Sequence, residues 1–327
     1  MTAAERQHRF RVMTAFLLVY FFWGSTYLAI RIAVEHIPPF MLGGTRFLTA
    51  GVLMLAYCAL TGRKVALSLA EAWRLAYIGV LLLTGGNMLL AYSEEVLPSG
   101  LAALIVATVP LWVALIEGFI LKGDRLRGWG WLGLFLGIVG LVVLIWPQFA
   151  PMVIPGSSPA SAAQNSGMLF ASGVLLLGSL SWSIGSIVSR RSSLSVGPIV
   201  ATGWEMIFAG GVNLIISLVH GDLHTTQWTA RGISAVVYLI IFGSWVGFTA
   251  YIWLLEHVPT PKVATYAYVN PVVAVFLGWL ILHEQVDRYI ALGTVVIVAA
   301  VALVTSSKLK LSPAPKKQVL PACEAEA

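Results

Sequence analysis

The sequence contains few charged residues and only two cysteines. Asp, Glu, Lys and Arg make up 10% of its 327 residues, whereas hydrophobic residues make up 58% and the mean hydropathy is +0.87. A soluble domain of this length needs charged side chains over most of its surface, so the composition excludes one. Cys58 falls in a long apolar run and Cys323 in the tail, which excludes a disulfide framework.

Motifs for ATP hydrolysis, metal binding and catalysis are also missing from the sequence. It has no Gly-rich loop ending in Lys-Ser or Lys-Thr, and neither His-Glu-x-x-His nor Cys-x-x-Cys spacing occurs. The pair His220 and His224 comes nearest to a metal cluster, but it falls between apolar runs in an exposed loop. We therefore expect no cofactor, no metal and no enzymatic activity.

Long apolar runs account for most of the chain. A transmembrane helix needs about 20 apolar residues, because it rises about 1.5 Å per residue through a hydrocarbon core of about 30 Å. This criterion predicts an all-α polytopic membrane protein with ten transmembrane helices. The predicted spans are 12–34, 40–61, 73–96, 99–121, 128–146, 167–189, 197–219, 232–256, 260–282 and 289–306.

The distribution of Lys and Arg predicts the orientation. An N-terminus in the cytoplasm places most of these residues at the inner ends of the spans, as the positive-inside rule requires. Both termini are then cytoplasmic. The same distribution accounts for the net charge of +6, which therefore does not indicate a nucleic-acid partner.

The second half of the chain repeats the first. A shift of 159 residues, and of 161 from the third span onward, aligns identical residues: Trp23 with Trp182, Arg31 with Arg190, Gly44 with Gly203, Pro98 with Pro259 and Pro110 with Pro271. Each copy has five predicted spans. Because five is odd, the second copy enters the membrane from the opposite side, which predicts two inverted five-helix repeats. Such repeats are typical of transporters that work by alternating access.

The repeat defines the expected regions of the chain. The segment between the copies has no charge and is rich in Pro, Ser, Ala and Gly, which predicts a flexible linker. The predicted regions are a cytoplasmic N-terminus (1–11), the first repeat (12–146), the linker (147–166), the second repeat (167–306) and a disordered cytoplasmic tail (307–327).

Several motifs resemble one family of membrane proteins. They are Phe22-Trp23-Gly24-Ser25-Thr26-Tyr27, Arg46-Phe47-Leu48, Leu97-Pro98-Ser99-Gly100-Leu101, Ala107-Thr108-Val109-Pro110 and Tyr266-Ala267-Tyr268-Val269-Asn270-Pro271. With their spacing and the duplication, they are similar to the EamA-type branch of the drug/metabolite transporter superfamily, the ten-span exporters of bacterial inner membranes. The resemblance covers about residues 12–306. It implies a cavity lined by spans one, three, four, six, eight and nine, with spans five and ten outside.

One position departs from the family pattern. The family usually has Gly-Glu at the end of the fourth and ninth spans. Here Glu284 matches it, Asp124 matches it more loosely, and the role of this acidic position stays open.

Aromatic and polar residues inside the spans are the candidate substrate contacts. Aromatic faces with a few hydrogen-bonding groups suit organic solutes that combine an apolar part with cationic or zwitterionic groups. The alternative for each aromatic residue is packing or interfacial anchoring. The candidates are Trp23, Tyr27, Asn87, Tyr92, Thr108, Trp112, Trp182, Trp245, Tyr251, Tyr266, Tyr268 and Asn270. Pro110 and Pro271 remove helical hydrogen bonds, and each is either a hinge or a site of kinked packing.

Few charges fall within the spans. Arg46 and Glu205 occupy equivalent places in the two repeats, and each needs a partner or water at such depth. They are either structural charges, paired or snorkelled, or Glu205 binds protons or a cationic substrate. We expect Glu94 and Glu95, at the outer end of the third span, to be solvated.

The predicted function is a secondary transporter that exports small organic metabolites, such as amino acids or drugs, across the inner membrane. Proton-coupled antiport and passive facilitation both stay open. A receptor without transport and an intramembrane enzyme are the alternatives from other classes; the repeats argue against the first and the sparse acid–base groups against the second. The expected partners are a small-molecule substrate, the lipid bilayer and, if transport is coupled, protons. Gly133 and Gly137 could serve internal packing or a dimer face, so the oligomeric state stays open.

Overall fold

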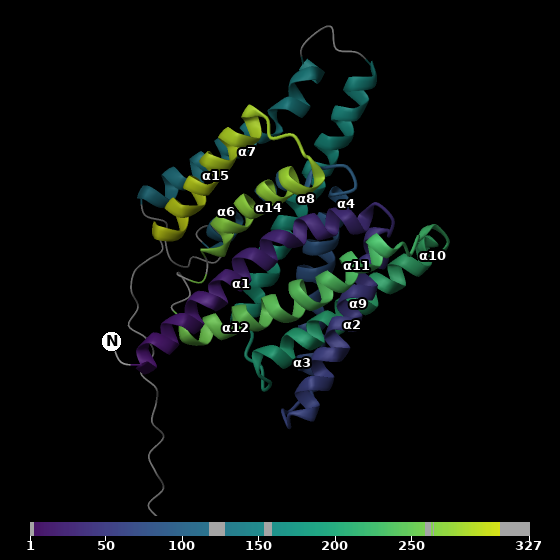
Figure 1. The fold of residues 1–327 in the computed structure, drawn as a ribbon, viewed down its shortest axis with the longest axis vertical. Helices are drawn as coiled ribbons and strands as arrows, with labels where there is room; N and C mark the ends of the chain where they lie inside the picture. The colour runs from purple at the N-terminus through teal and green to yellow at the C-terminus, as the bar shows by residue number, and fades with distance from the viewer. Residues whose placement is uncertain (1–2, 118–127, 154–158, 259–262, 264, 308–327) are drawn as a thin grey trace, which may run out of the picture.

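The computed structural model describes residues 3–117, 128–153, 159–258, 263 and 265–307 of the chain (Figure 1). Regular structure in these ranges is entirely helical. The first half contains α1 (Ala3–Val34), α2 (Pro39–Leu60), α3 (Leu69–Gly79), η1 (Val80–Met88), α4 (Leu89–Ser93), α5 (Ser99–Val106), α6 (Val109–Leu115) and α7 (Gly128–Val153). The second half contains α8 (Pro159–Arg191), α9 (Pro198–His220), α10 (Asp222–Thr225), α11 (Ala230–Tyr238), η3 (Leu239–Val246), α12 (Gly247–His257), α14 (Tyr266–Leu282) and α15 (Arg288–Ser307).

Within the described residues, seven helical segments are long and apolar enough to cross a membrane. They are Glu5–Val34, Pro39–Leu60, Leu69–Ser93, Gly128–Pro147, Asn165–Arg191, Pro198–His220 and Ala230–Leu254. Three further predicted spans coincide with shorter apolar helices, Ser99–Leu115, Tyr266–Leu282 and Arg288–Val304. The all-helical class is therefore confirmed. The total of ten transmembrane helices and the inverted repeat stay predictions.

Helices extend past two of the predicted boundaries, and the division into regions stays a prediction. The first helix begins at Ala3 rather than near residue 12. The expected linker 147–166 is largely helical, because α7 continues to Val153 and α8 begins at Pro159. Alanine has a high helix propensity and proline is tolerated in a first turn, so this uncharged segment can extend both helices. Residues 154–158, and the tail from 308 onward, lie outside the described residues.

Local sequence signals explain several helix ends. Pro39 and Pro198, which are repeat mates, each stand at the first position of a helix, where proline's fixed φ is favourable. Ser68 caps α3 by accepting a hydrogen bond from the backbone nitrogen of Glu71 at 3.3 Å, and the Glu71 carboxylate accepts one from the Ser68 nitrogen at 3.0 Å. Gly221, with φ of 80°, ends α9.

The third and eighth predicted spans share an unusual local structure. In each, a π-helical segment, η1 or η3, joins two α-helices into one rod. Both segments lie where another helix approaches closely. A Cβ on Gly86 would lie 2.7 Å from the Trp182 ring, and one on Gly247, just after η3, would collide with the Trp23 indole. π-Helical turns often occur at functional sites.

Helices α2 and α9 cross (Figure 1), and they approach each other closely at glycine residues. A Cβ on Gly44 would lie 3.0 Å from the Leu214 backbone, and one on Gly203 would lie 2.7 Å from a Leu55 methyl group. Gly203 and Leu214 stand 159 residues after Gly44 and Leu55, so the two contacts are reciprocal. Such small residues let membrane helices approach closely. Helices α7 and α15 pack side by side at the opposite edge of the bundle.

Candidate functional site

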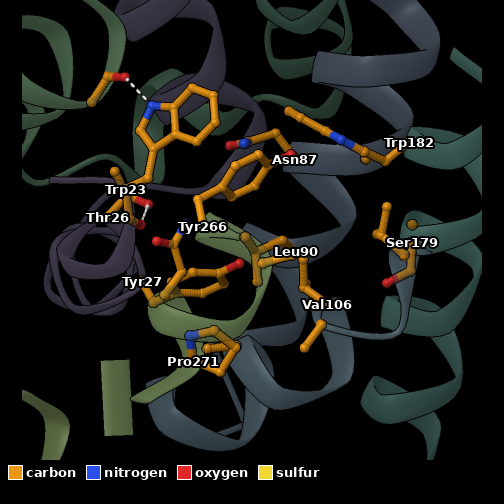
Figure 2. Close-up of a pocket in the computed structure, with 18 of the residues that line it drawn as sticks. Trp23, Thr26, Tyr27, Asn87, Leu90, Val106, Ser179, Trp182, Tyr266 and Pro271 are labelled. Carbon is orange, nitrogen blue, oxygen red and sulfur yellow. Dashed lines mark hydrogen bonds between the residues drawn. The ribbon is translucent and has the colours of Figure 1, made fainter. Parts of the chain in front are cut away.

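A cavity of about 140 Å³ lies among helices from both halves of the chain (Figure 2). Its walls come from α1, η1, α4, α5, α6, α8, η3, α12 and α14, which belong to the spans expected to line it, and α2 adds Arg46 and Phe47. Helices α7 and α15 supply none of the described lining residues. Of the residues singled out from the sequence, the lining includes Trp23, Tyr27, Arg46, Asn87, Pro110, Trp182, Tyr266, Asn270 and Pro271.

One wall of the cavity is a cluster of aromatic rings around Trp23. Its indole meets Phe248 and Tyr266 edge to face, with ring centroids 5.3 and 5.1 Å apart, and Tyr251 packs behind it at 4.9 Å. The indole Nε1 donates a hydrogen bond to the Gly243 carbonyl at 3.2 Å. Figure 2 shows Trp182 on the opposite side of the cavity. The two repeat-mate tryptophans therefore face one space from opposite sides.

Interrupted helices supply another wall. Helix α5 ends at Val106, a turn follows at Ala107 and Thr108, and α6 begins at Val109, next to Pro110. The Thr108 hydroxyl donates to the Ile105 carbonyl at 2.6 Å, so it serves its own turn. Pro271 lies inside α14, where it removes a helical hydrogen bond. Both prolines line the cavity, and their role as hinges stays a prediction.

Arg46 carries the only formal charge among the described lining residues. It is 4% exposed, and its Nη1 donates a hydrogen bond to the Asn87 side-chain oxygen at 3.3 Å. The guanidinium lies 4.7 Å from the centre of the Phe47 ring, a cation–π contact. Its Nε is buried without a hydrogen-bond partner.

The ion pair considered between Arg46 and Glu205 is not formed. Glu205 is buried in α9, with its backbone against Gly79 of α3, and it does not line the cavity. Arg46 instead reaches Asn87 of η1. Neither residue belongs to the two ion pairs found in the described part of the chain, Arg190–Glu117 at 2.7 Å and Arg231–Glu35 at 3.4 Å.

Other candidate contacts lie away from the cavity. Tyr92 is exposed at 41%, Trp245 donates to the Ala50 carbonyl at 3.3 Å, and Tyr268 packs against the hydrophobic core. Aromatic residues in membrane helices often serve packing or anchoring, which fits these positions. Roles in transport stay predictions for every candidate, both those in the lining and those outside it: Tyr92, Thr108, Trp112, Trp245, Tyr251, Tyr268 and Glu205.

Comparison with known proteins identifies the family. The model of the EamA-like transporter family matches residues 11–146 and 166–306. The chain belongs to this family. The uncharacterized inner membrane transporter YedA of Escherichia coli K12 is 39% identical over 297 residues, which cover 90% of this chain and 90% of that protein. The resemblance drawn from the sequence motifs is thus confirmed.

More distant relatives agree with the EamA assignment. The uncharacterized transporter YoaV of Bacillus subtilis is 25% identical, over 90% of this chain and 97% of its own. A WAT1-related chloroplastic protein of Arabidopsis thaliana is 27% identical, over 89% of this chain and 68% of that protein. A solved crystal structure with 20% identity and a TM-score of 0.59, covering 92% of this chain and 98% of its own, shares the fold. This EamA protein is a membrane transporter, not an enzyme.

Sequence reasoning missed several lining residues of the EamA cavity. Thr26 follows Trp23 by three positions and Ser179 precedes Trp182 by three, so helical spacing from either tryptophan could have found them. Leu90 and Val106 gave no such signal, because apolar residues are common throughout these spans.

The acidic position at the end of α14 has a structural role in this EamA chain. The Glu284 carboxylate accepts hydrogen bonds from the backbone nitrogens of Ser99 at 2.7 Å and Gly100 at 3.1 Å. It therefore caps the first turn of α5, where the helix dipole favours a negative charge. His283, with φ of 56°, turns the chain so that Glu284 can reach α5. Asp124 lies outside the described residues.

Glu94 differs from the prediction that it is solvated. It follows Ser93, the last residue of the third spanning segment, and it is fully buried, with both carboxylate oxygens lacking hydrogen-bond partners. Arg31 donates to its backbone carbonyl at 2.6 Å rather than to its side chain. Burial raises the pKa of Glu94 well above its ordinary value, the charge of Glu284 raises it further, and Arg31 opposes the shift. Glu95 is exposed, as expected.

Proposed function

We propose that this transporter exports small organic metabolites across the inner membrane by alternating access. The observation that carries the proposal is a cavity to which both halves of the chain contribute aromatic and polar side chains. A site between two repeats, lined by interrupted helices, suits a mechanism in which the repeats rock around a central solute. The reciprocal glycine contacts between α2 and α9 support a two-fold relation of repeats 12–146 and 167–306.

The proposed orientation places both termini in the cytoplasm. Its support is the concentration of Lys and Arg at one set of span ends. Reporter fusions at the C-terminus of the full chain test it, since a periplasm-active reporter should stay inactive there and become active when fused after Gly221.

Passive facilitation is the second candidate for the transport mode. It is favoured by the absence of Asp and Glu from the described residues that line the cavity. Proton coupling would have to act through an acid outside the lining, and Glu205, buried in α9, is the proposed group. Vesicle flux that is insensitive to an imposed pH gradient, and unchanged in Glu205→Gln, would favour the facilitator.

Metabolite profiling tests the transport function itself. Medium from cells that overproduce the chain should be enriched in one or a few solutes relative to medium from cells that lack it. Reconstituted vesicles should then move those solutes. Ala267→Phe, which adds a ring to a half-buried lining position, should abolish this flux. Ala291→Phe, on the exposed face of α15, is the matched control and should transport normally. The proposal fails if profiles are identical and vesicles move no solute.

A further inference from the structure

The electrical balance of the cavity is unusual for a membrane protein. Arg46 is the only charged residue among its described lining residues, and α2 itself contains no Asp or Glu. A charge buried in a bilayer generally faces an opposite charge or water. In the described part of the chain, no carboxylate forms an ion pair with Arg46. Among the described residues, nothing therefore compensates the positive charge of Arg46 in the cavity.

The hydrogen-bonding capacity of Arg46 is also mostly unused. A guanidinium has five N–H donors in one plane. Within the protein, one of these hydrogen bonds goes to Asn87, and Nε is buried without a partner. The Phe47 ring lies beside the guanidinium. This cation–π contact holds the guanidinium in place but uses none of its N–H donors. The remaining donors suit the paired oxygens of a carboxylate, which arginine binds in a bidentate manner.

The rest of the lining is mainly apolar and aromatic, with the uncharged polar side chains of Thr26, Ser179 and Asn270 among it. Figure 2 shows the Asn87 side chain between the sides of the cavity marked by Trp23 and Trp182. A flat apolar group can pack against these rings while its polar end reaches the Asn87 and Arg46 pair. The arrangement therefore provides a place that suits an anionic group, beside a surface that suits an aromatic one.

We infer that the transported solute is a small organic carboxylate with an aromatic or apolar body, and that Arg46 binds its carboxylate. The inference rests on the proposed transport function and specifies the chemistry of its site. It revises the preference expected from the sequence, because a solute with only cationic groups would meet the buried guanidinium. A zwitterion remains compatible, since it also presents a carboxylate.

Four related probes test the inference on the purified full chain. They are 3-phenylpropanoate, phenylalanine, 3-phenylpropanamide and 3-phenylpropylamine, which share a ring and differ in the charge of the end group. Quenching of tryptophan fluorescence and the shift of the thermal midpoint report binding. We expect the propanoate and phenylalanine to bind, and the amide and amine to bind roughly 10- to 100-fold more weakly, the range expected for losing hydrogen bonds to a charged group.

Substitutions assign the preference to Arg46. Arg46→Gln should remove the difference between propanoate and amide, and Arg46→Lys should retain part of it. Arg231→Gln is the matched control, because it removes a positive charge from a partly exposed ion pair. We expect this variant to keep the wild-type preference for the propanoate over the amide. The inference is overturned if the amine binds as well as the propanoate, if none of the probes binds, or if Arg46→Gln keeps the preference. If Arg46→Gln does not purify as a monodisperse protein, the ranking of the wild-type affinities for the four probes decides whether the inference holds.

The same preparation separates this inference from the proposed function. Wild-type vesicles that move a neutral or cationic solute but bind no carboxylate would refute the inference and leave transport intact. If the propanoate binds through Arg46 but no carboxylate or other solute is moved, the proposed transport function is refuted. The inference that Arg46 binds a carboxylate then stands.

Discussion

The α2–α9 crossing and the cavity follow the internal repeat to different extents. At the crossing, repeat mates have kept the same small residues, and each contact has its counterpart: Gly44 faces Leu214 as Gly203 faces Leu55. Because the helices approach closely at two equivalent places, both members of each pair of mates must be small residues. This constraint explains why the crossing is so regular.

The cavity shows the opposite behaviour. Trp23 and Trp182 match, but the mate of Arg46 is Glu205 and the mate of Tyr266 is Ile105. A small organic solute has no two-fold symmetry, so its contacts need not be duplicated. The comparison indicates that the repeat preserves the packing of the α2–α9 crossing, while the proposed binding site contains positions where the two copies differ.

A methyl group at Gly210 should produce the largest effect. A Cβ there would lie 2.5 Å from the Leu48 backbone nitrogen, so α2 and α9 would have to separate. Overpacking of this kind costs about 1–3 kcal/mol. Gly210→Ala should therefore lower the thermal midpoint of the purified chain. Its neighbour Gly211 has no atom within 4 Å of a Cβ, and Gly211→Ala should be neutral or stabilising because alanine favours helices.

The repeat mate of Gly210 extends this test. A Cβ on Gly51 would lie 2.7 Å from the Gly203 carbonyl oxygen. Gly51→Ala should lower the midpoint about as much as Gly210→Ala. A loss at one mate and none at the other would show that the crossing is not reciprocal in energy.

Removal of the charge at Glu284 should have a smaller effect. Glu284→Gln weakens two hydrogen bonds to α5, and caps of this kind typically contribute about 1 kcal/mol. The control is Asp287→Asn, because Asp287 caps α15 through Tyr289 and Ile290 of its own segment, and asparagine is an equally good cap. We expect a lower thermal midpoint only for Glu284→Gln. Equal midpoints for the two variants would contradict a special role for the contact between halves.

The matched tryptophans should respond unequally to replacement by phenylalanine. Trp23→Phe removes the donor to the Gly243 carbonyl, which should lower stability by about 1 kcal/mol. The Trp182 indole donates no hydrogen bond to a described residue, since Ser186 bonds only its backbone carbonyl, so Trp182→Phe should leave the thermal midpoint nearly unchanged. Both variants should reduce solute flux if both rings contact the solute. Identical midpoints would mean that the two sides of the cavity are equivalent after all.

The last expected effect is a pH dependence due to Glu94. Its pKa is raised in the folded protein, so the folded state holds a proton that the unfolded state loses above about 4.5. Stability should therefore fall as pH rises from about 4.5. Glu94→Gln should reduce the difference between thermal midpoints measured at pH 5 and pH 8. The mate of Glu94 is Leu255, so this dependence belongs to one copy only. A variant with an unchanged pH profile would exclude Glu94 as its source.

Much of this arrangement follows from the sequence because it depends on local pattern. Apolar runs locate the helices, and Trp23 and Tyr27 share a helix face because they are four residues apart. The repeat then relates Trp23 to Trp182 across the cavity. Helix capping was harder to predict, because Glu284 binds α5, whose first residue, Ser99, lies 185 positions earlier in the sequence.

The remaining features depend on packing between distant segments. Burial of Glu94 is one example, since its place at the end of a span predicts contact with solvent. The partner of Arg46 is another: symmetry suggests Glu205, but the helices bring Asn87 within hydrogen-bond distance. The side of α14 that meets the cavity is a third, because Tyr266 and Asn270 line it while Tyr268 does not. Each outcome depends on how helices rotate against one another, which a hydropathy pattern does not encode.

The Glu284 contact sets a limit on how the two halves can move. Any motion that separates α5 from the end of α14 breaks both hydrogen bonds together and exposes two backbone N–H groups and a carboxylate to water. Because water replaces these partners, the net change is a few kcal/mol rather than the full strength of two ionic hydrogen bonds. Taken alone, a difference of that size would still permit a minor separated population at equilibrium. In the proposed alternating access, the contact would therefore serve as a reversible latch that thermal motion can release without an external energy source.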